Sequence, residues 1–112
     1  LRKTLGEELF LSMPKNGVFI NSAQASVVDQ DGLIEALRQR KDLTAILDST
    51  DPMPLPEGHP LLQMENVVIT PHTAGSFGEE MERMGEEVVS ALRDYLAGVP
   101  SIHEIARERI PE

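Results

Sequence analysis

Three short apolar runs alternate along the chain with amphipathic stretches and polar turns. The runs lie at residues 17–21, 44–48 and 67–69. Each is short and rich in apolar or β-branched residues, which is typical of a buried parallel strand. Pro71 ends the third run, because proline cannot donate a hydrogen bond to a β ladder. The pattern therefore predicts three buried strands.

Amphipathic stretches between and after these runs predict helices. We expect a short helix over residues 7–13, a second that Asp29 caps and that continues to about residue 40, and a third over residues 77–97. Thr4 and Ser76 each begin a capping-box pattern ahead of the first and third helices. In the third helix, apolar positions recur at intervals of three and four residues, which we interpret as core packing. They are Met81, Met84, Val88, Leu92 and Tyr95.

The order of these elements indicates the fold class. Strand, helix, strand, loop, strand, helix is an α/β alternation, which predicts a parallel sheet. We expect half of a doubly wound, Rossmann-type sheet with flanking helices. Parallel strands bring their carboxyl ends to one edge, where open α/β sheets bind ligands. Residues 21–24, Asp48 and His72 follow the predicted strands, so the sequence predicts a polar site at that edge.

Residues 49–66 differ from the rest of the chain, because prolines forbid regular structure across most of the segment. Apolar residues at Met53, Leu55 and Leu61 nevertheless offer anchors to the body of the protein. A simple linker would lack such anchors. We favour a pinned loop beside a cleft over a linker.

Composition excludes several classes of function. The 112 residues suit one domain at most, and 19 acidic against 10 basic residues give a net charge of −9. That charge disfavours non-specific binding to nucleic acid and to an anionic membrane surface. No cysteine is present to form a disulfide or a zinc thiolate, and no apolar run approaches a membrane span. We expect a soluble, cytoplasmic protein, and its abrupt start suggests a fragment of something larger.

His72 is the strongest candidate for chemistry. A histidine near a carboxylate can act as an acid or a base close to neutral pH. The alternative is a strand-to-helix turn that carries a passenger histidine. His59 reads as a loop residue and His103 as an exposed one, and the three histidines lack the spacing of metal ligands. We therefore expect no metal site.

Several short motifs occur along the chain in a defined order and spacing. Together they are much more specific for one protein family than any single motif would be. They lie at residues 17–23, 28–33, 47–48, 54–56, 59–61, 66–72 and 74–75. With these motifs the chain resembles the D-isomer-specific 2-hydroxyacid dehydrogenases over nearly its whole length. The resemblance implies that residues 1–98 are the C-terminal half of a Rossmann-type NAD-binding domain. Residues 99–112 would be a tail that docks on a missing part or on a partner.

The resemblance also implies the reaction and its partners. The family transfers hydride between NAD or NADP and a 2-hydroxy or 2-keto acid, and its members are commonly homodimers. The glycine-rich phosphate loop and the adenosine-binding acid of the family lie upstream and are absent from this sequence. A histidine in the position of His72 protonates the carbonyl, and Asp48 matches an acid that holds the nicotinamide carboxamide. In the family, the position of His72 also lies beside the nicotinamide. Further family positions that line this side correspond here to Ser22, Ala23, Gln24 and Gly75.

Two positions depart from the family pattern. Gln24 stands where the family has an arginine that binds the substrate carboxylate, and glutamine has neither its charge nor its bidentate fork. Met53 stands where the family has a glutamate that pairs with the histidine. Asp51 is a disfavoured substitute for that glutamate. One interpretation is drift in a protein that no longer performs the reaction, and the other is a changed substrate class.

Three hypotheses of function remain open from the sequence. The leading one is a partial NAD(P)-dependent 2-hydroxyacid dehydrogenase. The second is a non-catalytic nucleotide-binding or protein-interaction module, and the third is a fragment with no activity of its own. The leading hypothesis predicts that Gln24, Asp48 and His72 face a common crevice with Met53 at its rim. It also predicts that His72 has no carboxylate within hydrogen-bonding distance.

Overall fold

The computed structural model describes residues 2–101 and residue 105. The chain divides into two compact units, Leu1–Gly75 and Ser76–Glu112, and each is described by itself. The expected boundary at residue 98 stays a prediction. The expected docking of the tail and the exposure of His103 fall largely or wholly outside the described residues. Within the described residues, no helix is both long and apolar enough to cross a bilayer.

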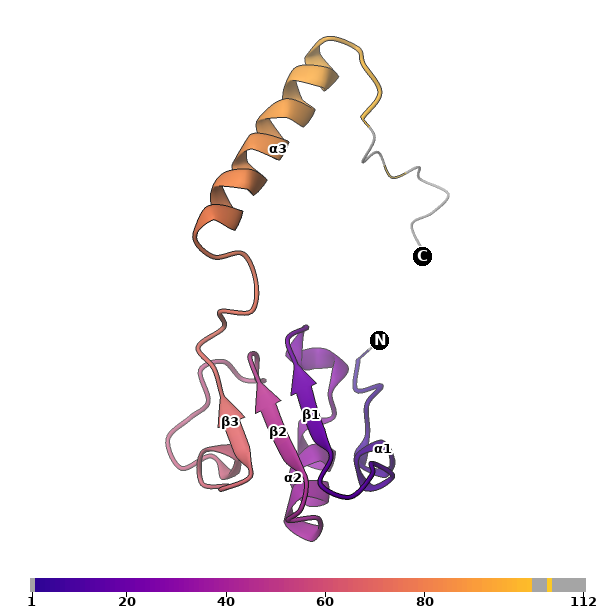
Figure 1. The fold of residues 1–112 in the computed structure, drawn as a ribbon, viewed down its shortest axis with the longest axis vertical. Coiled ribbons are helices and arrows are strands. Elements are labelled where there is room, and N and C mark those ends of the chain that lie inside the picture. The colour runs from indigo at the N-terminus through magenta and orange to yellow at the C-terminus, as the bar shows by residue number, and fades with distance from the viewer. Residues whose placement is uncertain (1, 102–104, 106–112) are drawn as a thin grey trace. The chain divides into compact units, whose positions relative to one another are not determined.

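The first unit contains a parallel sheet of three strands, which confirms the predicted fold class. The strands are β1 (Val18–Asn21), β2 (Thr44–Leu47) and β3 (Val67–Ile69), in the order β1-β2-β3 (Figure 1). Both neighbouring pairs are parallel. All three strands therefore end at the same edge of the sheet.

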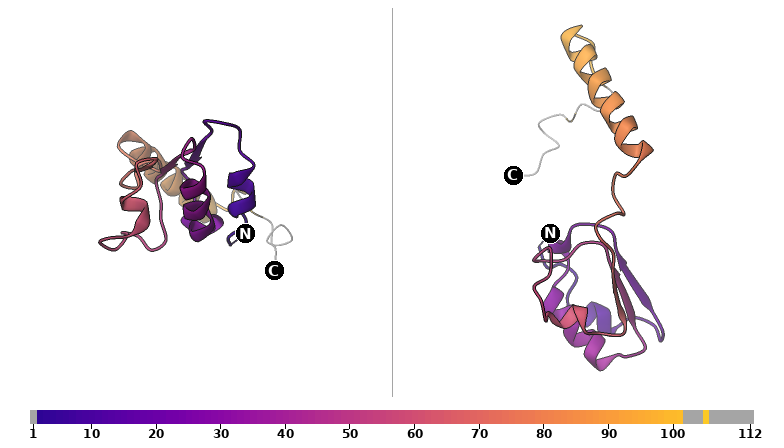
Figure 2. Two further views of the ribbon diagram at one scale, coloured as in Figure 1. Left: turned by 90° about the horizontal axis from the view of Figure 1, so that it is seen from below. Right: turned by 90° about the vertical axis from the view of Figure 1, so that its left-hand side faces the viewer.

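One face of the sheet is covered by helices and carries the core. Helices α1 (Glu7–Leu11) and α2 (Gln30–Gln39) lie on this face, together with the short 3₁₀ helix η2 (Pro60–Leu62) (Figure 2). Helix α2 buries one apolar stripe, as its pattern predicted. The fully buried large side chains are Phe10, Leu33, Leu37, Leu43 and Leu61.

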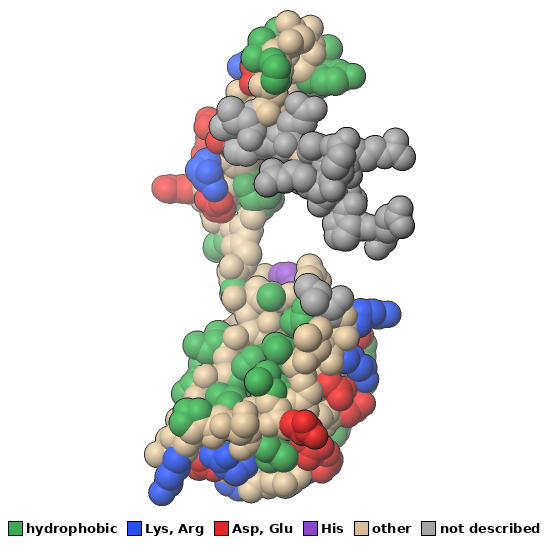
Figure 3. Space-filling view, turned by 90° about the vertical axis from the view of Figure 1, so that its right-hand side faces the viewer, with side chains coloured by type: hydrophobic (Ala, Val, Ile, Leu, Met, Phe, Trp, Pro, Cys, Tyr) green, Lys and Arg blue, Asp and Glu red, His purple; other side chains and the backbone are tan. Residues whose placement is uncertain are grey.

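The opposite face of the sheet is open. Side chains on this face retain large exposed fractions, with 53% at Val18, 64% at Ile20 and 49% at Val68. Figure 3 faces the β1 edge and shows hydrophobic side chains gathered there on the first unit. Within the first unit, the two outer strands are therefore buried on one face only, because that unit has no second layer on the other face.

The predicted capping boxes are absent. Gly6 precedes α1, and Gly78 precedes α3 (Glu79–Leu96), and neither helix has a side-chain cap. The first capping box does not form because Leu5 is extended and pairs with the chain around Val28. The helix therefore begins after Leu5. Gly78 has a φ of +60°, a backbone conformation that glycine adopts without a steric penalty.

Helix α3 ends as predicted. Gly98 follows it with a φ of +69°, as expected for a C-terminal glycine. No residue of α3 is buried, and Met81 is 58% exposed. The second unit by itself offers no core for the apolar stripe, so its interpretation as core packing stays a prediction. Ser76 contacts the Met84 sulfur through its hydroxyl, at 2.6 Å.

The proline-rich segment is pinned to the core, as expected. Leu61 is 1% exposed, and Leu55 and Met64 pack against the core cluster. Met53 was expected to be a further anchor, but its side chain is 50% exposed. This segment therefore leaves Met53 at the surface, where it reaches the site described below.

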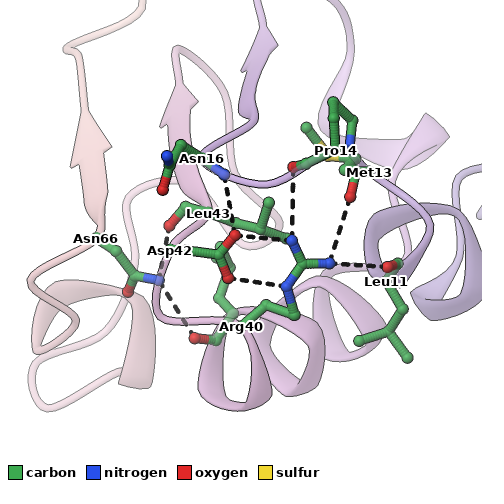
Figure 4. A network of polar contacts seen from close by, with 9 residues as sticks. Leu11, Met13, Pro14, Asn16, Arg40, Asp42, Leu43 and Asn66 are labelled. Carbon is green, nitrogen blue, oxygen red and sulfur yellow. Dashed lines mark hydrogen bonds and ion pairs between the residues drawn. The ribbon is translucent and has the colours of Figure 1, made fainter.

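A polar network fastens the opposite, amino-terminal edge of the sheet (Figure 4). The Arg40 guanidinium donates to the Leu11 and Met13 carbonyls at 3.0 and 3.3 Å and pairs with the Asp42 carboxylate at 2.7 Å. Asp42 also accepts the Asn16 N–H at 2.9 Å. The Arg40 and Asn16 hydrogen bonds hold the pKa of Asp42 well below its usual range. The network ties the end of α1 and the start of β1 to the end of α2.

Candidate functional site

The three loops that follow the strands meet at the carboxyl edge of the sheet. Residues 22–24 follow β1, residues 48–50 follow β2, and residues 70–74 follow β3. The parallel pairing aligns Asn21 with Leu47 and Leu47 with Ile69, so the three loops leave the sheet side by side. All the predicted site residues except Met53 and Gly75 lie on or at the end of these loops.

Asp48 is the polar centre of this edge. Its side chain is buried, with 7% of the residue exposed. Its Oδ1 accepts the Thr70 hydroxyl and the Thr73 N–H, the latter at 2.9 Å, and its Oδ2 accepts the Ala74 N–H at 2.9 Å. The Thr70 hydroxyl chiefly, then these amides and the charge of His72, lower the pKa of Asp48, against the opposing effect of burial. Asp48 is therefore held as a carboxylate near neutral pH.

His72 lies in the segment that Asp48 holds. Its φ is +57°, and its N–H donates to the Thr70 carbonyl at 2.9 Å. Its ring Nδ1 lies 3.3 Å from the Met53 sulfur. The ion pairs of residues 2–101 do not involve His72, so the side chain that its Nδ1 contacts there is that of Met53.

Asp51 does not replace the missing carboxylate. Its backbone N–H and carbonyl both bond the side-chain amide of Gln30, at 3.1 and 2.7 Å. These two bonds tie the start of the proline-rich loop to α2. They position the loop so that Met53, rather than Asp51, reaches His72.

The loop after β1 is fixed through Ala23. Its N–H donates to Asn21 Oδ1 at 3.1 Å, and its carbonyl accepts the Ser49 hydroxyl at 2.6 Å. Ser22 and Gln24 on either side are exposed, and Gln24 precedes the short 3₁₀ helix η1 (Ala25–Val27). In the described structure the Gln24 side chain bonds neither Asp48 nor His72. Their shared crevice stays a prediction.

The sequence reasoning missed the hydroxyl residues that tie these loops together. Ser49 bonds the loop after β1, and Thr70 bonds Asp48. Gly75, the last predicted position, is exposed, and open space surrounds its Cα. The sequence contained a signal for both residues, because each stands at the end of a predicted strand. Ser49 directly follows the buried Asp48, and Thr70 directly precedes the Pro71–His72 pair.

Sequence comparisons agree with this architecture. Residues 1–74 match the family model of the D-isomer specific 2-hydroxyacid dehydrogenase, NAD binding domain. The human glyoxylate reductase/hydroxypyruvate reductase is 37% identical over 99 residues, which cover 88% of this chain and 30% of that protein. The glyoxylate reductase of Korarchaeum cryptofilum is 36% identical over 94 residues, which cover 84% of this chain and 28% of that protein. The chain thus spans under a third of these two relatives.

Solved structures give the same result. A D-isomer specific 2-hydroxyacid dehydrogenase from Xanthobacter autotrophicus, solved in complex with NADPH, superposes with a TM-score of 0.81. It is 34% identical, and the match covers 96% of this chain and 44% of that chain. The parallel sheet, the polar carboxyl edge and the family match over residues 1–74 lead to one conclusion. The chain belongs to the D-isomer specific 2-hydroxyacid dehydrogenase family, within its NAD-binding domain.

Proposed function

We propose that this chain supplies the nicotinamide side and the acid–base histidine of an NAD- or NADP-dependent 2-hydroxyacid dehydrogenase. The observation that carries the proposal is the position of His72. It stands at the carboxyl edge of the parallel sheet, in a segment that a buried carboxylate holds from both sides. That edge is where open α/β sheets bind their ligands. The names of the relatives point to glyoxylate and hydroxypyruvate as the first substrates to test.

The residues present suit the nicotinamide end of the cofactor. Asp48 Oδ2 accepts one hydrogen bond, from the Ala74 N–H. A carboxylate oxygen can accept two, which leaves one position for the N–H of a carboxamide. The exposed neighbours Ser22, Gln24 and Gly75 would line this side. The nicotinamide supplies or accepts the hydride when it is bound.

The part that His72 plays follows from the charge that develops on the substrate. Reduction of a carbonyl carbon leaves negative charge on its oxygen, and a nearby acid must neutralise that charge with a proton. Protonated His72 would donate this proton from Nε2, because its Nδ1 faces the Met53 sulfur. A thioether is a weak acceptor and carries no charge, so it favours the imidazolium less than a carboxylate would.

Gln24 sets the expected preference for substrates. Its amide can donate hydrogen bonds to a substrate carboxylate, but it offers neither a charge nor the bidentate fork of arginine. We expect the site to hold ordinary 2-keto acids weakly and to reduce them slowly. A protein without turnover that still binds the dinucleotide is the second candidate function. The uncharged pair at Gln24 and Met53 is the observation that favours it.

The test joins this chain to a relative that has the remaining parts. In a chimera, the chain replaces the 94 matched residues of the Korarchaeum glyoxylate reductase. NADH binding is measured by fluorescence, and glyoxylate reduction by loss of NADH absorbance. Binding with turnover supports the dehydrogenase, and binding without turnover supports the second candidate. A folded chimera that does not bind NADH contradicts both functions.

The proposal includes the setting in which the enzyme works. From the family resemblance we infer a homodimer in the cytoplasm that acts on a small-molecule 2-hydroxy or 2-keto acid. Light scattering on the chimera tests the assembly, where a dimer is expected and a monomer contradicts this part of the proposal.

A further inference from the structure

Three hydrogen-bond donors that converge on Asp48 come from both sides of His72 in the chain. The Thr70 hydroxyl lies two residues before the histidine, and the Thr73 and Ala74 amides follow it directly. Each end of the Pro71–His72 turn is therefore fastened to one carboxylate. That carboxylate is itself fixed, because the Asp48 N–H donates to the Asn21 carbonyl at 2.9 Å.

His72 needs such fastening. Its φ of +57° lies in the left-handed region, which residues other than glycine populate sparsely. A residue in this conformation persists when the surrounding structure determines it. The turn is exposed, as are Pro71, His72 and Thr73, so no apolar packing is available to hold it. The polar contacts with Asp48 therefore restrain both ends of the turn, in addition to the His72 N–H bond to the Thr70 carbonyl and the contact of its ring with the Met53 sulfur.

We infer that Thr70 is a positioning residue for His72, which acts through its hydroxyl on Asp48. The hydroxyl is the side-chain donor of the three, and the other two are backbone amides that a conservative side-chain substitution leaves in place. It shares Oδ1 with the Thr73 N–H, so it sets the direction in which this oxygen meets the amide after His72. The inference rests on the proposed function only for the role of His72, because the contacts themselves are independent of any activity.

Burial of the carboxylate explains why the hydroxyl matters. Asp48 is 7% exposed, and a buried carboxylate needs hydrogen-bond donors to remain charged. The Thr70 hydroxyl is the largest cause of the lowered pKa of Asp48. Loss of the hydroxyl would remove the side-chain contact that orients the carboxylate, and the Thr73 and Ala74 amides that bond the same carboxylate would loosen with it. His72 would then lose its fixed place at the edge.

The experiment compares Thr70→Val and Thr70→Ala with Thr70→Ser in the 112-residue chain. Valine keeps the size and branching of threonine, and serine keeps the hydroxyl. The pH dependence of the Thr73 and Ala74 amide proton shifts in NMR spectra reports protonation of Asp48. Hydrogen exchange at the same amides reports how firmly they are held.

We expect Thr70→Val and Thr70→Ala to raise the pH of half-titration and to speed exchange at Thr73 by about tenfold or more, as for loss of a hydrogen bond to a charged group. Thr70→Ser should match the unchanged chain. Unchanged titration and exchange in the hydroxyl-free variants would overturn the inference. General unfolding of both variants would do the same, because the hydroxyl would then support the whole unit rather than the turn.

A second readout separates this inference from the proposed function. In the chimera, Thr70→Val should lower kcat by a larger factor than it lowers NADH affinity, and Thr70→Ser should restore kcat. If the chimera is inactive with every residue at position 70, the proposed function fails, while the NMR result still decides the role of Thr70. If kcat is equal in the valine and threonine forms of an active chimera, the positioning role is wrong.

Discussion

Met53 and Gln24 limit what His72 can do at the scale of single residues. Met53 places a thioether 3.3 Å from the imidazole Nδ1, where the family resemblance leads one to expect a carboxylate. Gln24 contributes an amide where the same resemblance leads one to expect a guanidinium. A changed substrate class and a loss of activity both fit this pair, and restoring the charges distinguishes them.

Gln24→Arg together with Met53→Glu should raise glyoxylate turnover by the chimera by at least about tenfold, because a bidentate cation and an anion beside the histidine return. The measurement is kcat/KM, with Gln24→Lys and Met53→Gln as the matched control. Lysine restores charge without the fork, and glutamine restores shape without the charge. The absence of any gain would show that the site has changed beyond these two positions.

Asp42 provides a prediction about pH that concerns stability alone. Its pKa in the folded chain is lowered by Arg40 and by the Asn16 N–H. The group therefore adds stability above its unfolded pKa of about 3.9, and this contribution is lost as the pH falls toward the folded pKa. Urea midpoints of the unchanged chain and of Asp42→Asn should differ at pH 7 and converge in acid. Glu57→Gln, at an exposed position, is the control, and a gap that widens on acidification would contradict the assignment.

At the scale of elements, the spacing of apolar residues and the positions of turn-forming residues predicted the strands and the middle helix within about one residue. Strand β3 and the buried stripe of α2 follow from patterns contained within the elements themselves. Helix α1 begins at the predicted residue 7, but the predicted capping box does not form, because long-range pairing of Leu5 with Val28 overrides the local capping pattern. The stripe of α3 predicts an apolar partner but cannot say whether this chain contains it. Likewise, the Asp48 and Thr70 pair joins residues 22 apart, which no local pattern reveals.

Gly32 tests how closely α1 and α2 approach. A mid-helix Gly→Ala change ordinarily stabilises a helix by about 1 kcal/mol. At Gly32 an added Cβ would lie 2.9 Å from the Glu7 backbone nitrogen, so Gly32→Ala should destabilise the first unit instead. Gly85→Ala is the matched control, because an added Cβ in α3 meets nothing within 4 Å and should increase helicity. Thermal unfolding and circular dichroism measure both, and stabilisation by Gly32→Ala would refute the close packing.

At the scale of the whole molecule, an apolar face of the sheet is exposed within the first unit, and the chain matches only part of the length of its relatives. Val18, Ile20 and Val68 remain exposed on the open side of the sheet. The chain covers 30% of the human relative and 28% of the archaeal one. The 112 residues contain no glycine-rich phosphate loop, whose amides and helix start would hold the pyrophosphate of a dinucleotide.

The isolated chain should therefore bind NAD only weakly, although we propose that it supplies residues for the nicotinamide end. Calorimetric titration of the 112-residue chain with NAD measures this directly. We expect a dissociation constant well above the micromolar range, and the chimera serves as the positive control. Micromolar binding by the isolated chain would mean that it has a phosphate site of its own.

The most direct test of the central claim is the effect of His72→Gln on single-turnover hydride transfer in the chimera that carries Gln24→Arg and Met53→Glu. Glutamine retains hydrogen bonding but cannot deliver a proton as imidazolium does. The account predicts a fall in the rate of about 10²–10⁴-fold, typical of the loss of a general acid. NADH affinity should fall by a much smaller factor than the rate. A rate equal to that of the histidine form would contradict the assignment of His72 as the acid–base group.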